Sequence, residues 1–562
     1  MAGPLRLPGR HLALALAVAT GRAVSEEWRA AEPGRWLPGQ ARPEGFGLQP
    51  RDARPPDIEG GRRILAGVFT LGGATLAAGA GGDPWDRPSP SRAFAEALHR
   101  FDWLPGLIAA GPEGAAEALR LVLEWRRIFG RWNGFAWAPE VMARRVFNLA
   151  CAGPALAARA SEAETAGIAM DLARQARSLL AAGGTAGAAE RAACAAVAGA
   201  ALRGIAGRRL LERALPRLSR ALAITVEPEG GHATRRPDAA LELLFDLQAL
   251  DEAMVQRGLA APDAVQRSIA RLAAAVRFFT LADGGLAAFH GGGPRSPSYV
   301  AAARAQDETG DRPTPSGLDG FQRLDSRAVQ VMADVATPPA GPWSTQACAQ
   351  SLSIQVVAGG RRLIEAAAGR GIDAASTMQV GERPYGRMLS GFAARVLGRR
   401  LTEAEAPVEV QRHEAPGAVW LELDHHGWMA RYGLMHQRRL YLDLDGGELR
   451  GEDRLTPTAK VQGPDGRHFV PYALRFQLHA GVRAQVSQDR RSVLLRREGD
   501  PGGWTLRNDA LDIALEPRAH GPGLQLVLRG QRRADSGARV RWKLAPATAP
   551  TIARVDAPPT AA

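Results

Sequence analysis

The sequence predicts an α+β protein of several domains, in which a helical half is followed by an antiparallel β half. Apolar residues between about positions 92 and 285 recur at the spacing of amphipathic helices. After about residue 316 they alternate with polar residues instead, as in strands that bury one face. The length of 562 residues is the third observation, because a domain of about 150 residues predicts three or four domains.

Residues 1–90 are expected to form an N-terminal extension that packs on the helical domain. Arg6 and Arg10 precede a short apolar run over residues 12–19. This pattern has two interpretations, a weak signal peptide or an amphipathic first helix. The sequence contains no run of about 18 apolar residues, so it predicts no transmembrane helix.

The helical domain is expected over residues 91–303. Apolar residues at helical spacing over 118–129 are typical of a helix with one buried face. Short loops between helices of roughly 15 to 20 residues predict antiparallel helical hairpins. The expected starts and stops are prolines at helix starts, a capping box and a glycine pair, namely Pro139, Pro237, Pro262, Ser161 with Glu164, and Gly183-Gly184.

The β half is expected over residues 316–545, after a polar boundary at 304–316. Leu440, Leu442 and Leu444 alternate with polar neighbours. The same pattern recurs over 511–515, 524–528 and 540–544, with turns at Asp445–Gly447 and Asp465–Gly466. One-sided strands of this kind predict a sheet packed on a sheet. Residues 546–562 are rich in proline, alanine and threonine and are expected to be a disordered tail.

The composition is basic, but it does not favour a nucleic-acid partner. The net charge is +13, yet only two of the 71 basic residues are lysine and the arginines are scattered, as GC-rich coding produces. Three cysteines cannot form a disulfide framework or a four-thiolate zinc site. Phosphate-binding loops, His-Glu-x-x-His motifs and Gly-x-Ser-x-Gly elbows do not occur, so no cofactor is expected.

Four stretches carry a resemblance to a known family. They are Glu229–Pro237, Phe278–Gly292, Gly320–Leu324 and Gly433–Leu455. The fourth is the longest and the most specific. Together they resemble the heparinase II/III-like family of bacterial proteins over about residues 90 to 545. The resemblance implies an N-terminal (α/α) toroid of helical hairpins followed by a C-terminal antiparallel β-sandwich, the layout of several polysaccharide lyases.

The resemblance also implies a chemistry. Characterised members of this family look like lyases that cleave uronate-containing, acidic polysaccharides by β-elimination. The reaction removes the C5 proton, α to a carboxylate, and expels the 4-O-glycoside. It therefore needs a group that neutralises the carboxylate, a base and an acid. The alternative is a catalytically degenerate, glycan-binding member of the same family.

The location and partner follow from the same resemblance. It implies a protein of the cell envelope or periplasm whose partner is an acidic polysaccharide. A cytoplasmic location stays open, because the signal peptide is unconvincing.

The candidate catalytic residues are His232, Arg236, His290, Tyr299 and His436. By resemblance, a residue at the loop after the Gly-Gly-His motif neutralises the carboxylate, and a tyrosine and a histidine near the cleft move protons. Tyr299 is the only tyrosine of the helical half and therefore the natural phenolic base. Each residue also has a structural interpretation, as a loop brace, a solvated arginine, a polar turn residue or a buried histidine.

The candidate substrate-binding residues are Arg235, Asn148 and Tyr432. Asn148 has the structural alternative of a hydrogen bond between hairpins. The tryptophans of the helical half, Trp103, Trp125, Trp132 and Trp137, are interpreted mainly as core, with a sugar-stacking platform as the alternative.

The sequence departs from the family pattern at three positions. Arg236 stands where close relatives usually have an asparagine, and Cys348 and Met388 stand where histidines are expected. The family's structural metal is therefore not expected here. The neighbours His425 and His426 point to opposite faces if they lie on a strand, which is poor geometry for joint metal binding.

Overall fold

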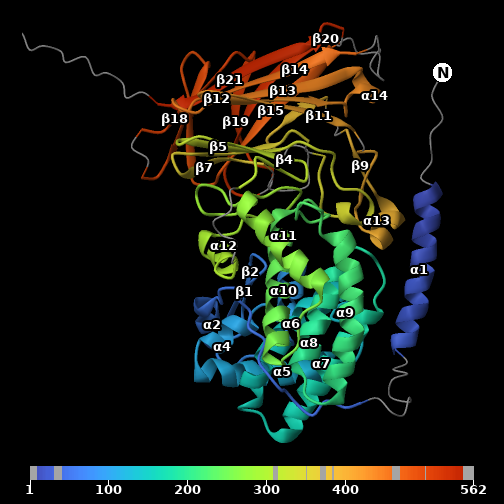
Figure 1. Ribbon diagram of the computed structural model, residues 1–562. Helices are drawn as coiled ribbons and strands as arrows, with labels where there is room; N and C mark the ends of the chain where they lie inside the picture. Colours follow the sequence, from blue (N-terminus) through green and yellow to red (C-terminus); the bar gives the residue numbers. More distant parts are fainter. Residues whose placement is uncertain are drawn as a thin grey trace, which may run out of the picture.

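The two predicted halves are present, and they stack end to end in Figure 1. The computed structural model describes residues 9–30, 41–307, 314–349, 351–366, 375–381, 385–404, 406–458, 469–499, 502–519, 521–533 and 535–547. The expected tail beyond residue 547 and the turn at Asp465–Gly466 lie outside the described residues. Among the described helices, none combines the length and the apolar character needed to cross a membrane.

Antiparallel helices form the toroid. They are α3 (Arg92–Arg100), α4 (Leu104–Ala109), α5 (Pro112–Phe129), α6 (Pro139–Ala157), α7 (Glu162–Ala181), α8 (Ala188–Ala201), α9 (Ile205–Thr225), α10 (Pro237–Gln256), α11 (Asp263–Phe279) and α12 (Pro297–Arg304). The predicted capping box is confirmed at Ser161 and Glu164. Pro139 and Pro237 are the first residues of α6 and α10, and Pro262 caps α11. Three of the four tryptophans named above, Trp103, Trp125 and Trp137, are buried in the helical core.

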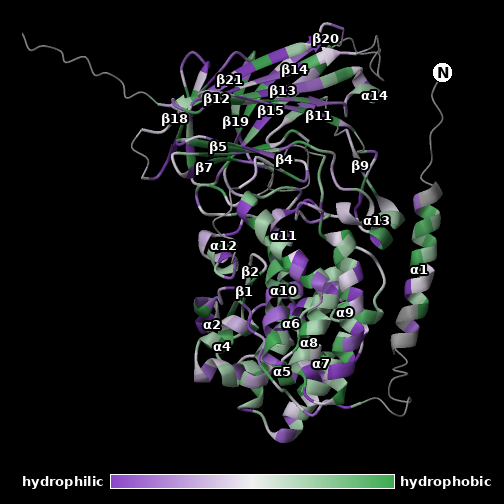
Figure 2. Ribbon diagram, in the orientation of Figure 1, coloured by the Kyte–Doolittle hydropathy of each residue, from purple (hydrophilic) through white to green (hydrophobic). Residues whose placement is uncertain are grey.

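The N-terminal extension has two parts with different neighbours. Residues 41–90 include α2 (Ile58–Leu65) and the hairpin of β1 (Val68–Leu71) and β2 (Ala74–Ala77), and they join the toroid core through Ile64 and Phe69. The helix α1 (Gly9–Ala30) instead contacts α13 (Gly391–Leu397) of the β half, with Ala15 buried against Leu389 and Leu397. Figure 2 shows apolar residues along much of α1. The signal-peptide interpretation stays a prediction.

Two antiparallel sheets form the β-sandwich. One sheet has the order β11-β12-β13-β14-β21-β18-β17-β16, and the other has the order β19-β20-β15-β7-β6-β5-β4-β3, with β8 paired to β15. The strands of the first sheet are β11 (Val408–Ala415), β12 (Ala418–His425), β13 (Leu434–Asp443), β14 (Leu449–Pro457), β16 (Val482–Val486), β17 (Ser492–Arg497), β18 (Trp504–Asn508) and β21 (Ala538–Pro546). Those of the second are β3 (Gly317–Leu318), β4 (Phe321–Asp325), β5 (Val329–Asp334), β6 (Ile354–Ala358), β7 (Arg361–Glu365), β8 (Met378–Val380), β15 (Phe469–Leu478), β19 (Asp512–Pro517) and β20 (Leu524–Arg533).

The predicted alternation fits β13 and β21, but not β20, in which Gln525 to Leu528 are all buried, and not residue 511. Leu440 and Leu442 in β13 are buried, as are Val540, Trp542 and Leu544 in β21. Leu511 precedes β19 and is 68% exposed, so its predicted inward position is wrong. The alternation fails there because the strand begins one residue later.

A continuous apolar core joins the toroid to the sandwich. Leu318, Phe321 and Met332 of the β half belong to the helical core, and Phe321 packs against Phe279 of α11 at a ring distance of 5.0 Å. This packing fixes the end of the toroid against the sheet of β4 and β5. Loops from both halves meet at this junction.

Candidate functional site

The α9–α10 loop, residues 226–236, is shaped by Gly230. A side chain on Gly230 would place its Cβ 2.1 Å from the carbonyl oxygen of Arg271, and the φ of Gly230 is +114°. Only glycine fits this position. The loop then folds back, with His232 bridged to Val226, and Pro237 starts α10. After this return, the side chains of Arg235 and Arg236 reach residues of the β half.

A cavity of about 510 Å³ lies at the junction of the two halves. The toroid supplies Ile224, Glu227, Gly231, His232, Ala233, Arg235, Arg236 and Phe279, and the β half supplies Asp319, Phe321, Ala336, Thr337, Pro338, Pro339, Ala340 and Trp343. Three of the eight sequence-predicted site residues line it: His232, Arg235 and Arg236. The volume suits a short stretch of a polymer or a small molecule.

His232 is buried and both of its ring nitrogens have partners. Its Nδ1 lies 2.7 Å from the hydroxyl of Thr234, and its Nε2 lies 3.1 Å from Glu190 Oε1. Burial acts to raise the pKa of Glu190, but the hydrogen bond and charge of His232, together with a backbone hydrogen bond and the charge of Arg191, bring it below its usual value. The ring of His232 also meets the indole of Trp343 nearly at right angles, with centroids 6.1 Å apart. His232 therefore both braces the loop and forms part of the cavity wall.

Arg235 fastens the loop to the sandwich. Its Nη2 lies 2.5 Å from Asp334 Oδ1 at the end of β5, and its Nη1 donates to the carbonyl oxygen of Asp319 at 2.6 Å. The guanidinium also lies over the ring of Phe321, 4.4 Å from its centroid. Arg235 has a φ of +55°, a conformation that costs energy for any residue with a Cβ. The positive charge of Arg235 is thus balanced by a carboxylate of the chain itself.

Arg236 is the helix cap of α10 and is only partly exposed. Its Nε and Nη2 donate to the two carboxylate oxygens of Asp238, at 3.1 and 2.6 Å, and its Nη1 donates to Gln346. This bidentate pair neutralises the guanidinium. A ligand carboxylate would have to compete with Asp238 for it.

His290 is not in the cavity. It is fully buried, has a φ of +51°, and its Nε2 lies 3.0 Å from Asp334 Oδ2. Burial lowers the pKa of His290, and Asp334 opposes this only in part. Burial also acts to raise the pKa of Asp334, but Arg235 and His290 together bring it below its usual value. The predicted role of His290 in proton transfer to a substrate is not supported, because the side chain has no exposed surface.

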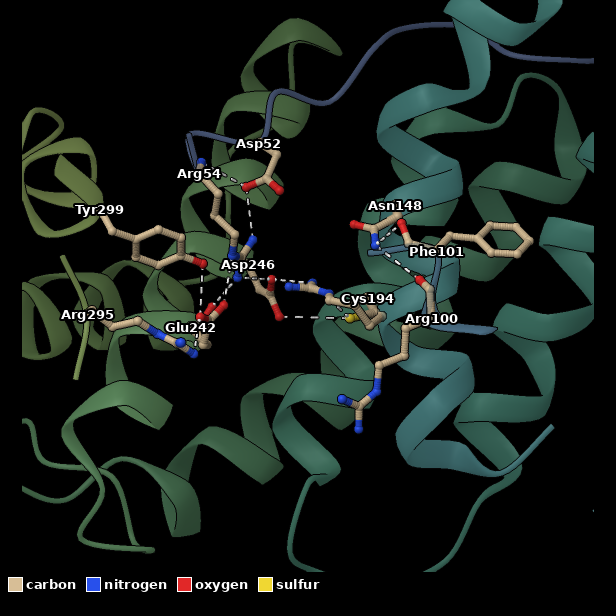
Figure 3. Close-up of polar contacts among 11 residues, drawn as sticks. Asp52, Arg54, Arg100, Phe101, Asn148, Cys194, Glu242, Asp246, Arg295 and Tyr299 are labelled. Atoms are coloured by element: carbon tan, nitrogen blue, oxygen red, sulfur yellow. Dashed lines mark hydrogen bonds and ion pairs between the residues drawn. The ribbon is translucent and has the colours of Figure 1, made fainter. Parts of the chain in front are cut away.

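Tyr299 lies in a buried cluster of charged residues between α10 and α12, drawn in Figure 3. Its hydroxyl donates to Glu242 Oε1 at 2.9 Å. Glu242 also accepts from Arg54 at 2.8 Å and from Arg295 at 3.0 Å. Burial, and then the charge of Glu242, raises the pKa of Tyr299. A phenol held in this way is a poor base, and Tyr299 does not line the cavity.

The cluster around Tyr299 has a structural role instead. Asp246 of α10 accepts from Arg54 at 2.8 Å and from Arg144 of α6 at 2.6 Å. Arg54 belongs to the N-terminal extension, so these ion pairs attach the extension to the toroid (Figure 3). The attraction within a buried ion pair largely offsets the cost of removing its charges from water. We therefore expect these pairs to determine where the extension docks on the toroid more than they add to the free energy of unfolding.

His436 lies inside the sandwich. Its Nε2 is 2.8 Å from Asp453 Oδ1, and Asp453 also accepts from Arg438 at 2.8 Å and from Trp542 at 3.0 Å. Burial would raise the pKa of Asp453, but Arg438 and His436 bring it down to about 2. The interpretation of His436 as an active-site histidine is not supported, because it is a buried member of the core.

The remaining candidates are also structural. The side-chain amide of Asn148 donates to the carbonyl oxygens of Arg100 and Phe101, both at 3.1 Å, and so joins α6 to the end of α3. Tyr432 ends the short helix α14 (Met429–Tyr432) and packs against Trp428 on the sandwich. Neither residue lines the cavity. His425 ends β12 and is buried, whereas His426 lies beyond the strand and is partly exposed, so the two are not alternating residues of one strand.

Glu227, Asp319 and Trp343 are among the cavity residues that sequence reasoning missed. Asp319 immediately precedes the third family block, and its φ of +43° marks it as a strained position. Trp343 lies in a short 3-10 helix (Gly341–Ser344) after a proline pair. No periodic pattern in the sequence marks these positions.

The described residues do not fit the metal site of the family. Among them, no group of three or more histidine, cysteine, aspartate or glutamate side chains comes together as a set of metal ligands. Cys348 is buried, and Met388 lies in a two-residue strand, β9 (Arg387–Met388).

Comparison with known proteins agrees with this architecture. Residues 311–543 match the family model described as heparinase II/III-like, C-terminal. The FtsZ-localized protein C of Caulobacter vibrioides (strain NA1000 / CB15N) is 46% identical over 566 residues, covering 97% of this chain and 98% of that protein.

Solved structures show the fold. The crystal structure of heparinase III matches with a TM-score of 0.68 at 12% identity, over 97% of this chain and 92% of that one. A mutant of the heparan sulfate lyase HepC from Pedobacter heparinus matches with a TM-score of 0.53 at 14% identity, over 96% and 90%. This chain therefore belongs to the heparinase II/III-like family and is a polysaccharide lyase-like protein built from a toroid and a β-sandwich.

Proposed function

We propose that this protein binds a glycan in the cavity between the toroid and the sandwich and does not cleave it by β-elimination. The family and its fold support a polysaccharide as the ligand. The cavity has the composition of a sugar site, since it combines an indole and apolar side chains with a few polar groups.

One observation argues against β-elimination. The three residues expected to move protons, Tyr299, His290 and His436, lie outside the cavity, and each is held by a carboxylate of the chain. Abstraction of a C5 proton needs a base within about 3 Å of it in a plausible substrate pose. Their carboxylate partners, Glu242, Asp334 and Asp453, would have to release them first. Among the described residues that line the cavity, none is a tyrosine that would replace Tyr299.

β-Elimination at a uronate remains the second candidate function. It is favoured by the presence of His232 and Arg236 in the same cavity, which would supply a proton acceptor and a partner for a carboxylate. Both groups are already paired, His232 with Glu190 and Thr234, and Arg236 with Asp238. The arrangement therefore supports elimination less well than it supports binding.

The deciding experiment measures cleavage and binding on the same glycans. Purified protein is incubated with heparan-type, alginate-type and bacterial capsular oligosaccharides and with amino-sugar oligomers. The ultraviolet absorbance of a new C4=C5 double bond reports elimination, and calorimetry reports binding. We expect saturable binding of at least one oligosaccharide with no absorbance change.

Matched variants assign either result to the cavity. Arg236→Ala and His232→Gln change cavity residues, and Arg439→Ala changes an arginine that is 60% exposed on the outer face of the sandwich. Absorbance that rises with the wild type and is lost in the two cavity variants alone would establish elimination and refute the first proposal. The absence of both binding and cleavage across the whole set would refute both functions.

We also infer a location from the relative in Caulobacter. That protein is named for its localisation with FtsZ, and the identity of 46% extends over nearly the full length of both chains. A fluorescent fusion of this protein is expected to gather where FtsZ gathers in the native cell. Diffuse fluorescence in cells with assembled FtsZ would contradict this. The cell-envelope location implied by the family stays a prediction.

A further inference from the structure

Negative charge prevails around the cavity. Glu227 and Asp319 line it, and Glu229 accepts a hydrogen bond from the backbone N–H of Asp319. The backbone N–H of Gly231 donates to Asp319 Oδ2 at 2.6 Å. Within the described part of the chain, no recorded ion pair joins these three carboxylates to an arginine, lysine or histidine. Their charges are therefore left to a ligand or to solvent.

The arginine side chains that line the cavity are already paired with carboxylates of the chain. Arg235 is paired with Asp334 and Arg236 with Asp238, each as a close ion pair of 2.5 to 2.6 Å. His232 faces Glu190. Burial, and then the nearby Glu229 and Glu227, raises the pKa of Asp319, as crowding of negative groups requires. A polyuronate placed here would meet like charge.

The uncharged part of the wall suits a pyranose ring. Trp343 is half-buried, and its perpendicular contact with His232 covers at most one face of the indole. Pro338, Pro339 and Ile224 are further apolar residues of the same cavity wall. Sugar rings present C–H groups that pack on such a surface while their polar substituents point outward.

We infer that the cavity takes a glycan of amine-bearing amino sugars, with protonated amines at Glu227 and Asp319, and discriminates against uronates. This inference rests on the proposed function, because it names the sugar class for that same site. An ammonium group donates up to three hydrogen bonds and would meet two carboxylate acceptors here. A uronate carboxylate a few ångströms from them would be repelled instead.

The test compares four ligands of equal length by calorimetry on the full-length protein: a glucosamine tetramer, its N-acetylated form, a tetrauronate and tetralysine. We expect the glucosamine tetramer to bind at least about tenfold more tightly than the N-acetylated form, and the tetrauronate to bind most weakly. The preference for the amine should shrink at high salt.

Two variants tie the preference to the carboxylates. The double variant Glu227→Gln, Asp319→Asn removes two negative charges but keeps a side-chain oxygen that can accept from the backbone N–H of Gly231. It should reduce the preference for the amine about tenfold. Glu409→Gln is the control, since Glu409 is 65% exposed on the outer sheet. The control should leave the preference unchanged.

The outcomes separate the two proposals. A tetrauronate that binds as tightly as the glucosamine tetramer overturns the inference and leaves glycan binding intact. Tetralysine that binds as tightly as the amino sugar overturns the sugar class, because charge alone would then be recognised. Binding of none of the four ligands by a folded protein overturns both the inference and the proposed function.

Discussion

Arg235 and Asp334 join the two halves of the molecule through a buried ion pair of 2.5 Å. Arg235 comes from the glycine-shaped loop of the toroid, and Asp334 ends β5 of the sandwich and has no exposed surface. His290 approaches the other oxygen of the same carboxylate at 3.0 Å. One carboxylate thus holds the α9–α10 loop, which lines the cavity, and the loop that carries His290, which does not.

Asp334→Asn should destabilise the protein strongly. The change leaves Arg235 buried without its counter-charge, and breaking one partner of a buried pair costs about 3 kcal/mol or more. The midpoint of urea unfolding is the measurement. Asp325→Asn is the control, because Asp325 is 48% exposed and its pair with Arg323 is near the surface. Equal midpoints for the two variants would show that the Arg235–Asp334 pair does not stabilise the junction.

Tyr299→Phe should leave glycan binding within about twofold of the wild type. The hydroxyl is bonded to Glu242 in the buried cluster, so its loss should cost about 1 kcal/mol of unfolding free energy and no affinity. Calorimetry and urea unfolding measure the two effects. Tyr441→Phe, at an exposed site on β13, provides the comparison. A loss of binding with an intact fold would place Tyr299 in the site after all.

The fold could be predicted because its causes are local. The capping box at Ser161 and the prolines at 139 and 237 act within one turn of helix, and the alternation in β13 and β21 records a single buried face. The family blocks then specify how the halves are ordered. Leu511 was misplaced because alternation does not say at which residue a strand begins.

The site could be predicted only in part because side-chain partners are distant in sequence. Tyr299 and Glu242 are 57 residues apart, and Arg235 and Asp334 are 99 apart. Residue type alone indicates a proton-transfer role for Tyr299, His290 and His436. In the folded chain, each side chain instead contacts a carboxylate that is distant in sequence. Glu227 and Asp319 lie in loops and Trp343 in a single turn of 3-10 helix, where no periodicity marks the direction of a side chain.

Trp343→Ala should weaken glycan binding by about tenfold or more. The indole is the largest apolar side chain of the β half in the cavity wall, and truncating such an anchor commonly costs over 1 kcal/mol. Trp420→Ala is a matched control, because Trp420 is half-buried on the outer face of β12 beside His413. Equal losses of affinity in the two variants would mean that the glycan binds elsewhere or that the loss is indirect.

Unfolding free energy should fall with pH below about 6.5, and His425 should account for much of the slope. Burial lowers the pKa of His425 to about 3, and neither of its ring nitrogens has a hydrogen-bond partner among the described residues. The ring packs against Tyr385. Between the folded pKa and the unfolded value of about 6.5, the unfolded chain binds the extra proton. The folded protein, which keeps this imidazole neutral, therefore loses unfolding free energy as the pH falls through this window, by about 2 kcal/mol at pH 5.

His425→Gln removes this titration and should flatten the decline between pH 7 and pH 5 by about that amount. Urea unfolding at pH 7, 6 and 5 measures it, with His413→Gln on the outer face of β11 as the control. The slope of unfolding free energy against pH is the quantity to compare, because it counts protons and is insensitive to a uniform loss of stability. A slope in His425→Gln equal to that of the wild type would assign the acid sensitivity to His290 and His436, whose pKa values burial also lowers.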